Sequence, residues 1–536
     1  MKLTSKYRNV YGAPQKDKFT DLRMAEITSE GSLLAINQSF LAVSWQGVGG
    51  CVGIFNPNTP SRIATEIPVL RGHSSYVSEL KFNPFRPNML ATGSDDTTVK
   101  LWELPEGGIT EDMENDVQTF KGHQRKIVNV AFNPVVDGVI ASTSFDKTCQ
   151  IWNIAKAEAI CKVDFKDVPT SLDWNYNGSL VGASTKEKLI YLIDPRTNAV
   201  AVKAKGHQSH KIQKMLFIED NYFISCGFNK NSQREVKLYD IRNQTDAMIE
   251  SSIASIVVDR QSGVMTPFYD SGLKLLYVPG RGEGNIHYYD LNDLTLKECS
   301  EYKSSQPQKQ IAMFEKKLMD YNKCEIARFA KVVANTVEYL SFYVPRRNPG
   351  YEREFYPNIA AGEAALTYDD WIAGQNAEPI VKEITEIENK WVSAVPIVFE
   401  KKQEEVKKSS EDIIKEMEAK MLGLEQKVNN LTAANEKLNK EIATMKEKCA
   451  ALEKENEELK SRPKEETAPV EEPVQEQEQV QEPPQEEQVQ EPVQEEEQVQ
   501  EPPQEEAVQE QEPPQEEVAQ EPPQEEEQVQ EPPQEE

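Results

Sequence analysis

The chain has 536 residues, enough for several domains, and a formal net charge of −30. The negative charge is concentrated at one end, because residues 465–536 contain 27 Glu and no Asp, Lys or Arg, which leaves the first 464 residues with a net charge of −3. The acidic average therefore does not exclude an acidic partner for the folded part, whereas seven scattered cysteines without a Cys-x-x-Cys pair argue against a disulfide framework and a zinc site.

The N-terminus, MKLTSKYRNVYG, is polar and basic, whereas a secretory signal needs an apolar core at this place. No run in the chain approaches the roughly 18 apolar residues of a membrane span. We therefore expect a cytoplasmic protein that does not insert into membranes and has no nucleic-acid partner.

Seven segments of one design recur over the first two thirds of the chain, each an alternating apolar strand that ends near an aromatic or apolar residue. With one marker per segment, the steps between markers are 47, 50, 41, 46, 50 and 54 residues, close to the period of about 40–45 residues of WD40 blades. A single four-stranded blade cannot bury both faces, so the repeats predict a mainly β fold, a seven-bladed WD40 β-propeller over residues 1–345. The markers are Phe55, Trp102, Trp152, Ile193, Tyr239, Tyr289 and Tyr343.

Two repeats carry the polar set of a WD blade, in which His, a Ser or Thr of the second strand, the Asp of a turn and Trp form a buried hydrogen-bond chain. The two predicted tetrads are His73, Ser94, Asp96 and Trp102, and His123, Ser144, Asp146 and Trp152. The other blades lack most of these groups, so we expect them to rest more on apolar packing.

A catalytic interpretation of these residues is weaker. A Ser/His/Asp set repeated at structural positions favours architecture over hydrolysis. The glycines of Gly280–Gly284 are not followed by the Lys-Ser/Thr of a phosphate loop, which favours a hairpin turn. We predict no enzymatic activity, no cofactor and no metal.

In residues 346–402 the repeat stops but the composition stays globular, with seven aromatic residues among Pro and Gly. Since the segment is too aromatic for a free linker, we expect it to pack on the propeller, with Thr367 capping a short helix. A short linker over residues 403–410 follows. These aromatic residues include Tyr351, Phe355, Tyr356, Trp371, Trp391 and Phe399.

Residues 411–460 have a strict period of seven, which predicts an α-helical coiled coil. An amphipathic helix folded against its own domain would instead show a broader stripe at period 3.6. The predicted d positions are Met417, Leu424, Leu431, Leu438, Met445, Leu452 and Leu459, and the a positions are Ile414, Met421, Val428, Asn435, Ile442, Cys449 and Asn456.

Charges beside this seam favour a parallel homo-oligomer. In a parallel, in-register pair the g-to-e contacts would be Lys420 with Glu425, Glu441 with Lys446, and Lys448 with Glu453, all of opposite sign. Asn435 and Asn456 in the a layer favour a two-stranded coiled coil, and a trimer is the alternative.

Residues 461–536 are built from E-P-P-Q-E-E and Q-E-Q-V-Q units and contain no aromatic residue, Leu or Ile. Such a segment cannot bury enough apolar surface to offset the ordering entropy, so we expect a disordered tail. A spacer is favoured. The alternative, an acidic docking arm or a Pro-rich ligand for SH3-type domains, lacks the usual adjacent Arg or Lys.

A propeller joined through a packed extension to a short coiled coil resembles the coronins. Local segments similar to that family lie at residues 5–12 (SKYRNVYG), 227–240, 322–329 (NKCEIARF), 344–347 (VPRR) and 365–371 (ALTYDDW). The resemblance covers residues 5 to about 374 and implies a filamentous-actin binding protein of the cortical cytoskeleton. It also implies a second partner, the branch-nucleating complex of actin-related proteins.

The resemblance assigns filament binding to an arginine shortly after the N-terminal signature, which here is Arg23. Residues 2–23 also carry six basic side chains against two acidic ones, and such a patch would attract an acidic filament. We therefore predict that Arg23, Lys6 and Arg8 bind actin. One departure concerns a trimer-favouring motif that begins with Arg in some coronins: Lys420 stands there, and lysine cannot make the two-bond contact of arginine.

The predicted mechanism is avidity. Two or more propellers tied by the helix make the second filament contact intramolecular, so crosslinking or bundling follows from geometry. The rival hypothesis is a general WD40 scaffold or adaptor that uses the propeller face and does not contact actin. Filament pelleting separates the two.

Overall fold

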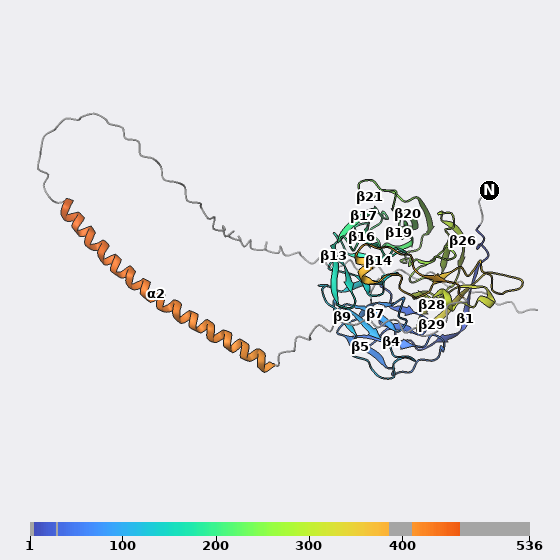
Figure 1. Ribbon diagram of the computed structural model, residues 1–536, viewed down its shortest axis with the longest axis horizontal. Coiled ribbons are helices and arrows are strands. Elements are labelled where there is room, and N and C mark those ends of the chain that lie inside the picture. The colour runs from blue at the N-terminus through green and yellow to red at the C-terminus, as the bar shows by residue number, and fades with distance from the viewer. Residues whose placement is uncertain (1–4, 28–30, 385–409, 461–536) are drawn as a thin grey trace, which may run out of the picture. The chain divides into compact units, whose positions relative to one another are not determined.

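The structure is a computed structural model that describes residues 5–27, 31–384 and 410–460 (Figure 1). The chain divides into two compact units, one with the β-rich part and one with most of the C-terminal helix. The predicted tail, the linker up to residue 409 and residues 385–402, with Trp391 and Phe399, lie outside the described residues. Within the described ranges, no helix is both long and apolar enough to cross a membrane.

Seven antiparallel sheets form the blades of a propeller, which confirms the fold predicted from the repeat. The first strands of successive blades contact one another, so they line the centre. All seven marker residues lie on the third strand of their blades.

The strands of the first three blades are β2 (Leu34–Ile36), β3 (Leu41–Trp45), β4 (Gly50–Phe55) and β5 (Val69–His73), then β6 (Val77–Phe82), β7 (Met89–Ser94), β8 (Val99–Glu103) and β9 (Gln118–Phe120), then β10 (Ile127–Phe132), β11 (Val139–Ser144), β12 (Thr148–Asn153) and β13 (Glu158–Asp164). The next three blades contain β14 (Pro169–Trp174), β15 (Val181–Thr185), β16 (Leu189–Asp194) and β17 (Ala199–Lys205), then β18 (Lys214–Glu219), β19 (Tyr222–Phe228), β20 (Arg234–Asp240) and β22 (Ala254–Asp259), then β23 (Phe268–Asp270), β24 (Leu275–Pro279), β25 (Ile286–Asp290) and β26 (Lys297–Tyr302). A short strand, β21 (Met248–Ile249), adds a parallel edge to blade 4.

The seventh blade closes the ring with a strand from the start of the chain. Its first three strands are β27 (Gln308–Met313), β28 (Glu325–Val333) and β29 (Thr336–Tyr343), with the 3₁₀ helices η1 (Lys316–Leu318) and η2 (Tyr321–Lys323) between β27 and β28. The fourth strand is β1 (Tyr11–Phe19), which pairs antiparallel with β29 and lies beside it in Figure 1. Closure of this kind ties the start of the chain to the last blade, with β1 as the outer strand of that blade.

The blades without a tetrad were predicted to rest more on apolar packing, and the core shared by blades 6 and 7 has this character. In the core shared by blades 6 and 7, the ring centroid of Tyr277 lies 5.2 Å from those of Phe329 and Phe342. All three side chains are buried. Aromatic pairs at this spacing stabilise a fold beyond the area that they bury.

The disc has two faces that carry different connections. The tetrad face, named for His73 and His123, carries the connections from each fourth strand to the next blade and the turns between second and third strands. Gly280–Gly284 forms such a turn between β24 and β25, as predicted, and Gly282 has φ +78°, which glycine adopts readily. The opposite face carries the turns between first and second strands, and we call it the extension face.

The described part of the extension packs on the extension face. Its short helix α1 (Tyr368–Ile372) begins after Thr367, whose hydroxyl accepts the backbone N–H of Asp370, as predicted. Trp371 is fully buried, and its ring centroid lies 6.1 Å from that of Trp174. Its indole N–H donates to the Gly178 carbonyl at 2.9 Å. A two-stranded hairpin, β30 (Ile359–Ala360) with β31 (Val381–Lys382), flanks this helix in the chain. The extension is therefore part of the propeller's core.

The C-terminal helix α2 (Ser410–Lys460) is continuous over 51 residues. At about 1.5 Å per residue it is about 77 Å long.

Candidate functional site

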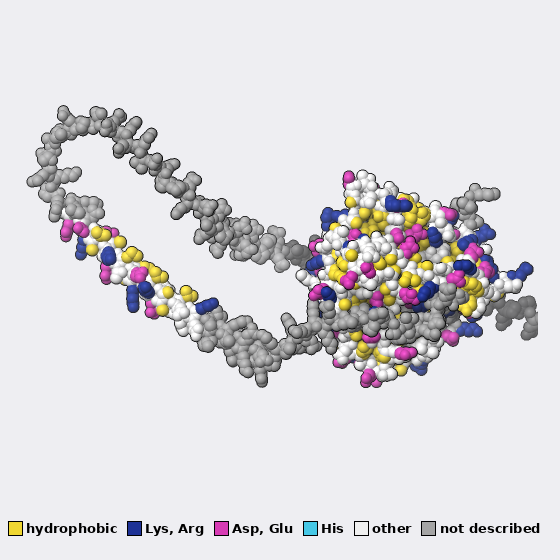
Figure 2. Space-filling view, viewed as in Figure 1, with side chains coloured by type: hydrophobic (Ala, Val, Ile, Leu, Met, Phe, Trp, Pro, Cys, Tyr) yellow, Lys and Arg dark blue, Asp and Glu magenta, His cyan; other side chains and the backbone are white. Residues whose placement is uncertain are grey.

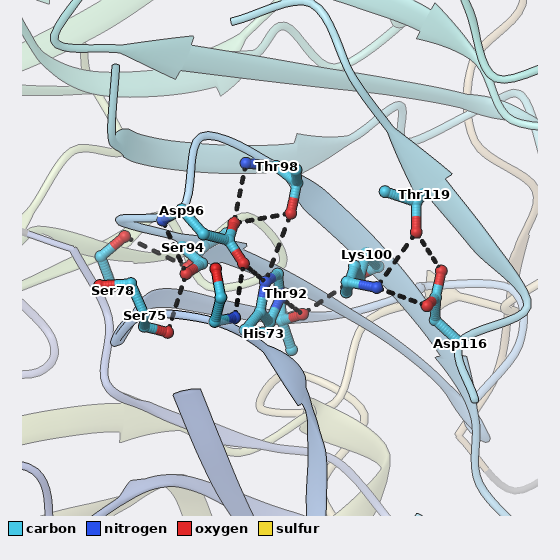
Figure 3. Close-up of polar contacts among 12 residues, drawn as sticks. His73, Ser75, Ser78, Thr92, Ser94, Asp96, Thr98, Lys100, Asp116 and Thr119 are labelled. Atoms are coloured by element: carbon cyan, nitrogen blue, oxygen red, sulfur yellow. Dashed lines mark hydrogen bonds and ion pairs between the residues drawn. The ribbon is translucent and has the colours of Figure 1, made fainter. Parts of the chain in front are cut away.

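The polar chain of blade 2 links two loops of the tetrad face to the core (Figure 3). His73 Nδ1 lies 2.7 Å from Asp96 Oδ2, and His73 Nε2 lies 2.7 Å from Thr92 Oγ1. The indole N–H of Trp102 donates to the same Thr92 hydroxyl at 2.9 Å. The predicted member Ser94 was wrong, because its hydroxyl instead donates to the Ser75 carbonyl and accepts the backbone N–H of Asp96.

Blade 3 repeats this arrangement. His123 lies 3.0 Å from Asp146 Oδ2 and 2.8 Å from Ser142 Oγ, and Trp152 donates to Ser142 at 2.8 Å. The prediction of Ser144 was therefore also wrong. Trp152 pairs with Ile140 in the sheet, so its ring reaches the diagonal neighbour Ser142 but not Ser144, which is about 7 Å further along the strand.

These tetrads have the environment of structural groups. Partial burial works to raise the pKa of Asp96, but hydrogen bonds from His73 and Thr98 outweigh it and hold the pKa below its ordinary value. The Thr92 side chain is buried and already accepts the indole N–H, so it is not presented as a nucleophile. Among the described residues, no group of three or more His, Cys, Asp or Glu is placed to hold a metal ion.

Arg23 lies at the rim of the tetrad face, in the connection from β1 to β2. Its side chain is exposed, and its Nη1 donates to the Thr65 carbonyl at 3.3 Å. Beside it, Arg62 pairs with Asp21 at 2.6 Å, and these four residues line one shallow depression. The depression therefore holds two guanidinium groups and one carboxylate.

The backbone around Arg23 is held on both sides. The N–H of Leu22 donates to the Asn335 carbonyl at 2.9 Å, and the N–H of Gln46 donates to the Arg23 carbonyl at 2.8 Å. These bonds join the connection to blades 7 and 1. A side chain on such a fixed backbone loses less conformational freedom when a partner binds.

Lys6 and Arg8 lie at the other end of β1 and are not part of the Arg23 depression. The register of β1 runs from Tyr11 opposite Tyr343 to Phe19 opposite Val337, so its two ends are about 20 Å apart. Lys6 pairs with Glu354 of the extension at 2.8 Å. The structure therefore divides the predicted basic cluster between opposite faces of the disc.

A second basic surface was missed by sequence reasoning. Its residues come from the tetrad-face connections of blades 3–5, and they are spread over more than a hundred positions of sequence that only the propeller topology brings to one face. The signal that could have revealed it is a lysine in the turn between second and third strands of three successive repeats. We call this surface the basic patch, and it consists of Lys121, Arg125, Lys126, Lys147, Lys166, Lys186, Lys188, Lys211, Lys230 and Arg260.

The central channel contains a buried carboxylate. Glu79 of β6 is 2% exposed, and its Oε2 accepts the backbone N–H of Ser32 at 2.6 Å. Burial raises the pKa of Glu79 to about 7, although Lys81, the Ser32 N–H and Lys214 act in the opposite direction.

This carboxylate makes stability depend on pH. Between the ordinary pKa of 4.5 and the folded value of about 7, the folded protein holds a proton that the unfolded chain has released. The free energy of unfolding should therefore fall as the pH rises through this window, by at most about 3 kcal/mol. Urea unfolding at pH 5 and pH 8 tests this. Glu79→Gln should reduce the difference, of which Asp173, whose pKa burial raises to about 6, retains a part, whereas Gln at the exposed Glu66 should leave it unchanged.

The predicted oligomerisation seam is exposed along the part of α2 whose side chains the structure describes. Leu431, Leu438, Ile442, Met445 and Leu452 are between 45% and 70% exposed, and yellow side chains follow the helix in Figure 2. Asn435 and Cys449 on the same seam are exposed as well. The side chains of the remaining seam positions, Ile414, Met417, Met421, Leu424, Val428, Asn456 and Leu459, lie outside the described residues.

Three known protein families match segments of the propeller and its extension. A family described as "Domain of unknown function (DUF1899)" matches residues 3–62, which contain β1 and Arg23. The family "WD domain, G-beta repeat" matches residues 64–103 and 114–153, the two segments that contain the tetrads. A family described as "Type of WD40 repeat" matches residues 337–379, from β29 through α1.

Curated relatives match over most of the chain. Coronin-A of Dictyostelium discoideum is 41% identical over 381 residues, covering 70% of this chain and 84% of the relative. Coronin-2B of Homo sapiens is 36% identical over 392 residues, covering 72% of this chain and 80% of the relative. The crystal structure of the WD40 domain from Toxoplasma gondii coronin superposes with a TM-score of 0.68 at 29% identity, covering 71% of this chain and 98% of that domain.

Proposed function

The chain belongs to the coronin family, and from this membership we propose that it is a cytoplasmic, actin-associated WD40 protein that binds filaments through its propeller. Its role is binding and assembly rather than catalysis. The observation that carries the proposal is the identity of 41% with Coronin-A over 381 residues. Within the proposal, the cortical actin cytoskeleton is its place of action.

Arg23 is the proposed main contact. It is exposed on a backbone that hydrogen bonds hold from both sides, and the neighbouring Arg62 adds positive charge to the same depression. An acidic filament surface would gain charge-assisted hydrogen bonds from such a group. Lys6 and Arg8 are proposed as a second contact, on the opposite face.

Arg23→Asp should weaken co-sedimentation with actin filaments about tenfold or more, because it reverses a charge at the contact without removing core packing. The measurement is the fraction of protein that pellets over a titration of filaments. Lys156→Asp is the matched control, since Lys156 is exposed in blade 3 on the extension face.

Unchanged pelleting of the Arg23 variant beside binding wild type would remove Arg23 from the contact. If wild type itself stayed in the supernatant, a general WD40 adaptor would become the better hypothesis. Lys6→Glu with Arg8→Glu tests the second contact in the same assay.

Oligomerisation through α2 is the other half of the proposal. The exposed leucines of the seam support a homo-oligomer, with a parallel dimer favoured and a trimer open. Tied propellers would crosslink or bundle filaments, because effective concentrations near the millimolar range raise avidity by about 10² to 10⁴. The nucleating complex of actin-related proteins is proposed as a further partner of such an assembly.

A further inference from the structure

The basic patch on the tetrad face holds lysines close together. The ammonium groups of Lys126 and Lys186, from blades 3 and 4, lie 4.5 Å and 5.8 Å from the centre of the same Phe145 ring. The Nζ of Lys147 donates to the backbone carbonyl of Lys166 at 3.1 Å, which brings a third and a fourth lysine together. Several lysines therefore gather on one part of this face, where an anionic partner could attract more than one ammonium group.

The fold supplies fewer carboxylates than cations to this patch. Within the described ranges, none of its ten residues forms an ion pair with a carboxylate. Some carboxylates lie near the patch: Asp95 interacts electrostatically with Lys126, while hydrogen bonds orient Asp146 toward His123, Asp167 toward a backbone N–H and Glu187 toward the hydroxyl of Tyr191. The patch therefore presents an excess of positive charge to solvent.

One segment of the chain has the complementary composition. Residues 465–536 contain 27 Glu and no basic residue, while the rest of the chain is nearly neutral. The glutamates recur in pairs and triplets at short intervals, as in E-P-P-Q-E-E, so many positions along the segment could meet several lysines at once.

The glutamate-rich segment is long enough to reach a propeller. The 76 residues from Ser461 to the end could extend to about 250 Å, compared with about 77 Å for α2. The contact could be made with the propeller of the same chain or with that of a partner chain.

We propose that the basic patch binds the glutamate-rich segment 465–536. The contact is electrostatic, so it weakens as salt rises beyond the range at which charges are screened. Because an actin filament is also acidic, the segment would compete with the filament for the tetrad face. This last consequence rests on the proposed function, whereas the contact itself does not.

Carbodiimide crosslinking of the full chain tests the contact directly, because the reagent joins a carboxylate to an amine only where they touch. We expect peptides that link the tail glutamates to Lys126, Lys147, Lys166, Lys186 or Lys188 at about 50 mM salt, and a clear loss of these peptides at about 500 mM salt. Mass spectrometry after digestion gives the yield at each lysine.

Two full-length variants control the result. Lys126→Glu with Lys186→Glu should lower the total yield of tail crosslinks about five- to tenfold, since both changes replace attraction of the tail by repulsion. Lys156→Glu with Lys162→Glu makes the same change at exposed lysines of blade 3 outside the patch and should leave the yield unchanged. Crosslinks spread evenly over lysines of both faces, or unchanged in the patch variant, would overturn the proposal.

A competition arm adds the filament. Replacing the 27 tail glutamates by Gln keeps the length of the chain and should strengthen filament pelleting about threefold or more at low salt. If neither protein pelleted, the proposed function would fail while the crosslinks would still decide the tail contact. If vesicles of anionic lipid bound the patch and the tail gave no crosslinks to it, a membrane surface would replace the tail as occupant and the proposal would be wrong.

Discussion

Replacing Leu431 and Leu438 by Lys is expected to convert the protein into single chains of 60.8 kDa. Both leucines are exposed on the isolated helix and occupy successive d positions of the seam. In an assembled coiled coil each would be buried, and two lysines there would place unpaired charges in an apolar layer. Light scattering gives the mass, and low-speed pelleting of filaments gives bundling.

The single chains should still bind filaments, but with an apparent affinity lower by about 10² to 10⁴, because the second contact is no longer intramolecular. Ala433→Lys with Ala443→Lys is the matched control, since it adds the same charges at predicted f and b positions outside the seam. The interpretation fails if the leucine variant keeps the mass of an oligomer, or if the alanine variant loses it as well.

Trp371→Ala should destabilise the propeller by about 3–5 kcal/mol, the range for removing a fully buried tryptophan. The side chain packs against Trp174 and donates to the Gly178 carbonyl, so its loss leaves a cavity and an unpaired acceptor. Urea unfolding followed by circular dichroism measures the loss.

Two further variants of the same helix separate the contribution of the buried ring from that of its N–H and from nonspecific effects of substitution. Trp371→Phe keeps most of the ring but loses the N–H, so it should cost about 1–3 kcal/mol. Ile372→Ala changes an exposed side chain of the same helix and should cost well under 1 kcal/mol. If the Trp371→Ala and Ile372→Ala proteins had the same free energy of unfolding, the extension would not contribute to the core of the propeller.

The sequence predicted the elements that repeat. The markers Trp102 and Tyr239 lie on third strands because every blade has the same alternation and nearly the same length. The cap at Thr367 was also predictable, since a threonine followed by two aspartates is a local signal. These features depend on neighbours in sequence.

Features that depend on register or on distant pairing were missed. Thr92 and Ser94 lie on the same face of β7, so only the alignment with Trp102 decides which hydroxyl joins the tetrad. The separation of Lys6 from Arg23 follows from the pairing of β1 with β29, for which no local pattern exists. The basic patch likewise required the topology that brings Lys126 and Lys186 to one aromatic ring.

The use of the first strand to complete the last blade has a consequence for biogenesis. During synthesis, β1 leaves the ribosome long before its pairing partner β29, since Tyr11 pairs with Tyr343. The strand β1 therefore stays unpaired while the first six blades are made. Arg23 lies in the connection that follows that strand, and the carbonyl of Asn335, which accepts a hydrogen bond from this connection, is also synthesised late. A nascent or truncated chain that lacks blade 7 should therefore be unable to form the proposed filament contact at Arg23. Filament binding would then require a completed propeller.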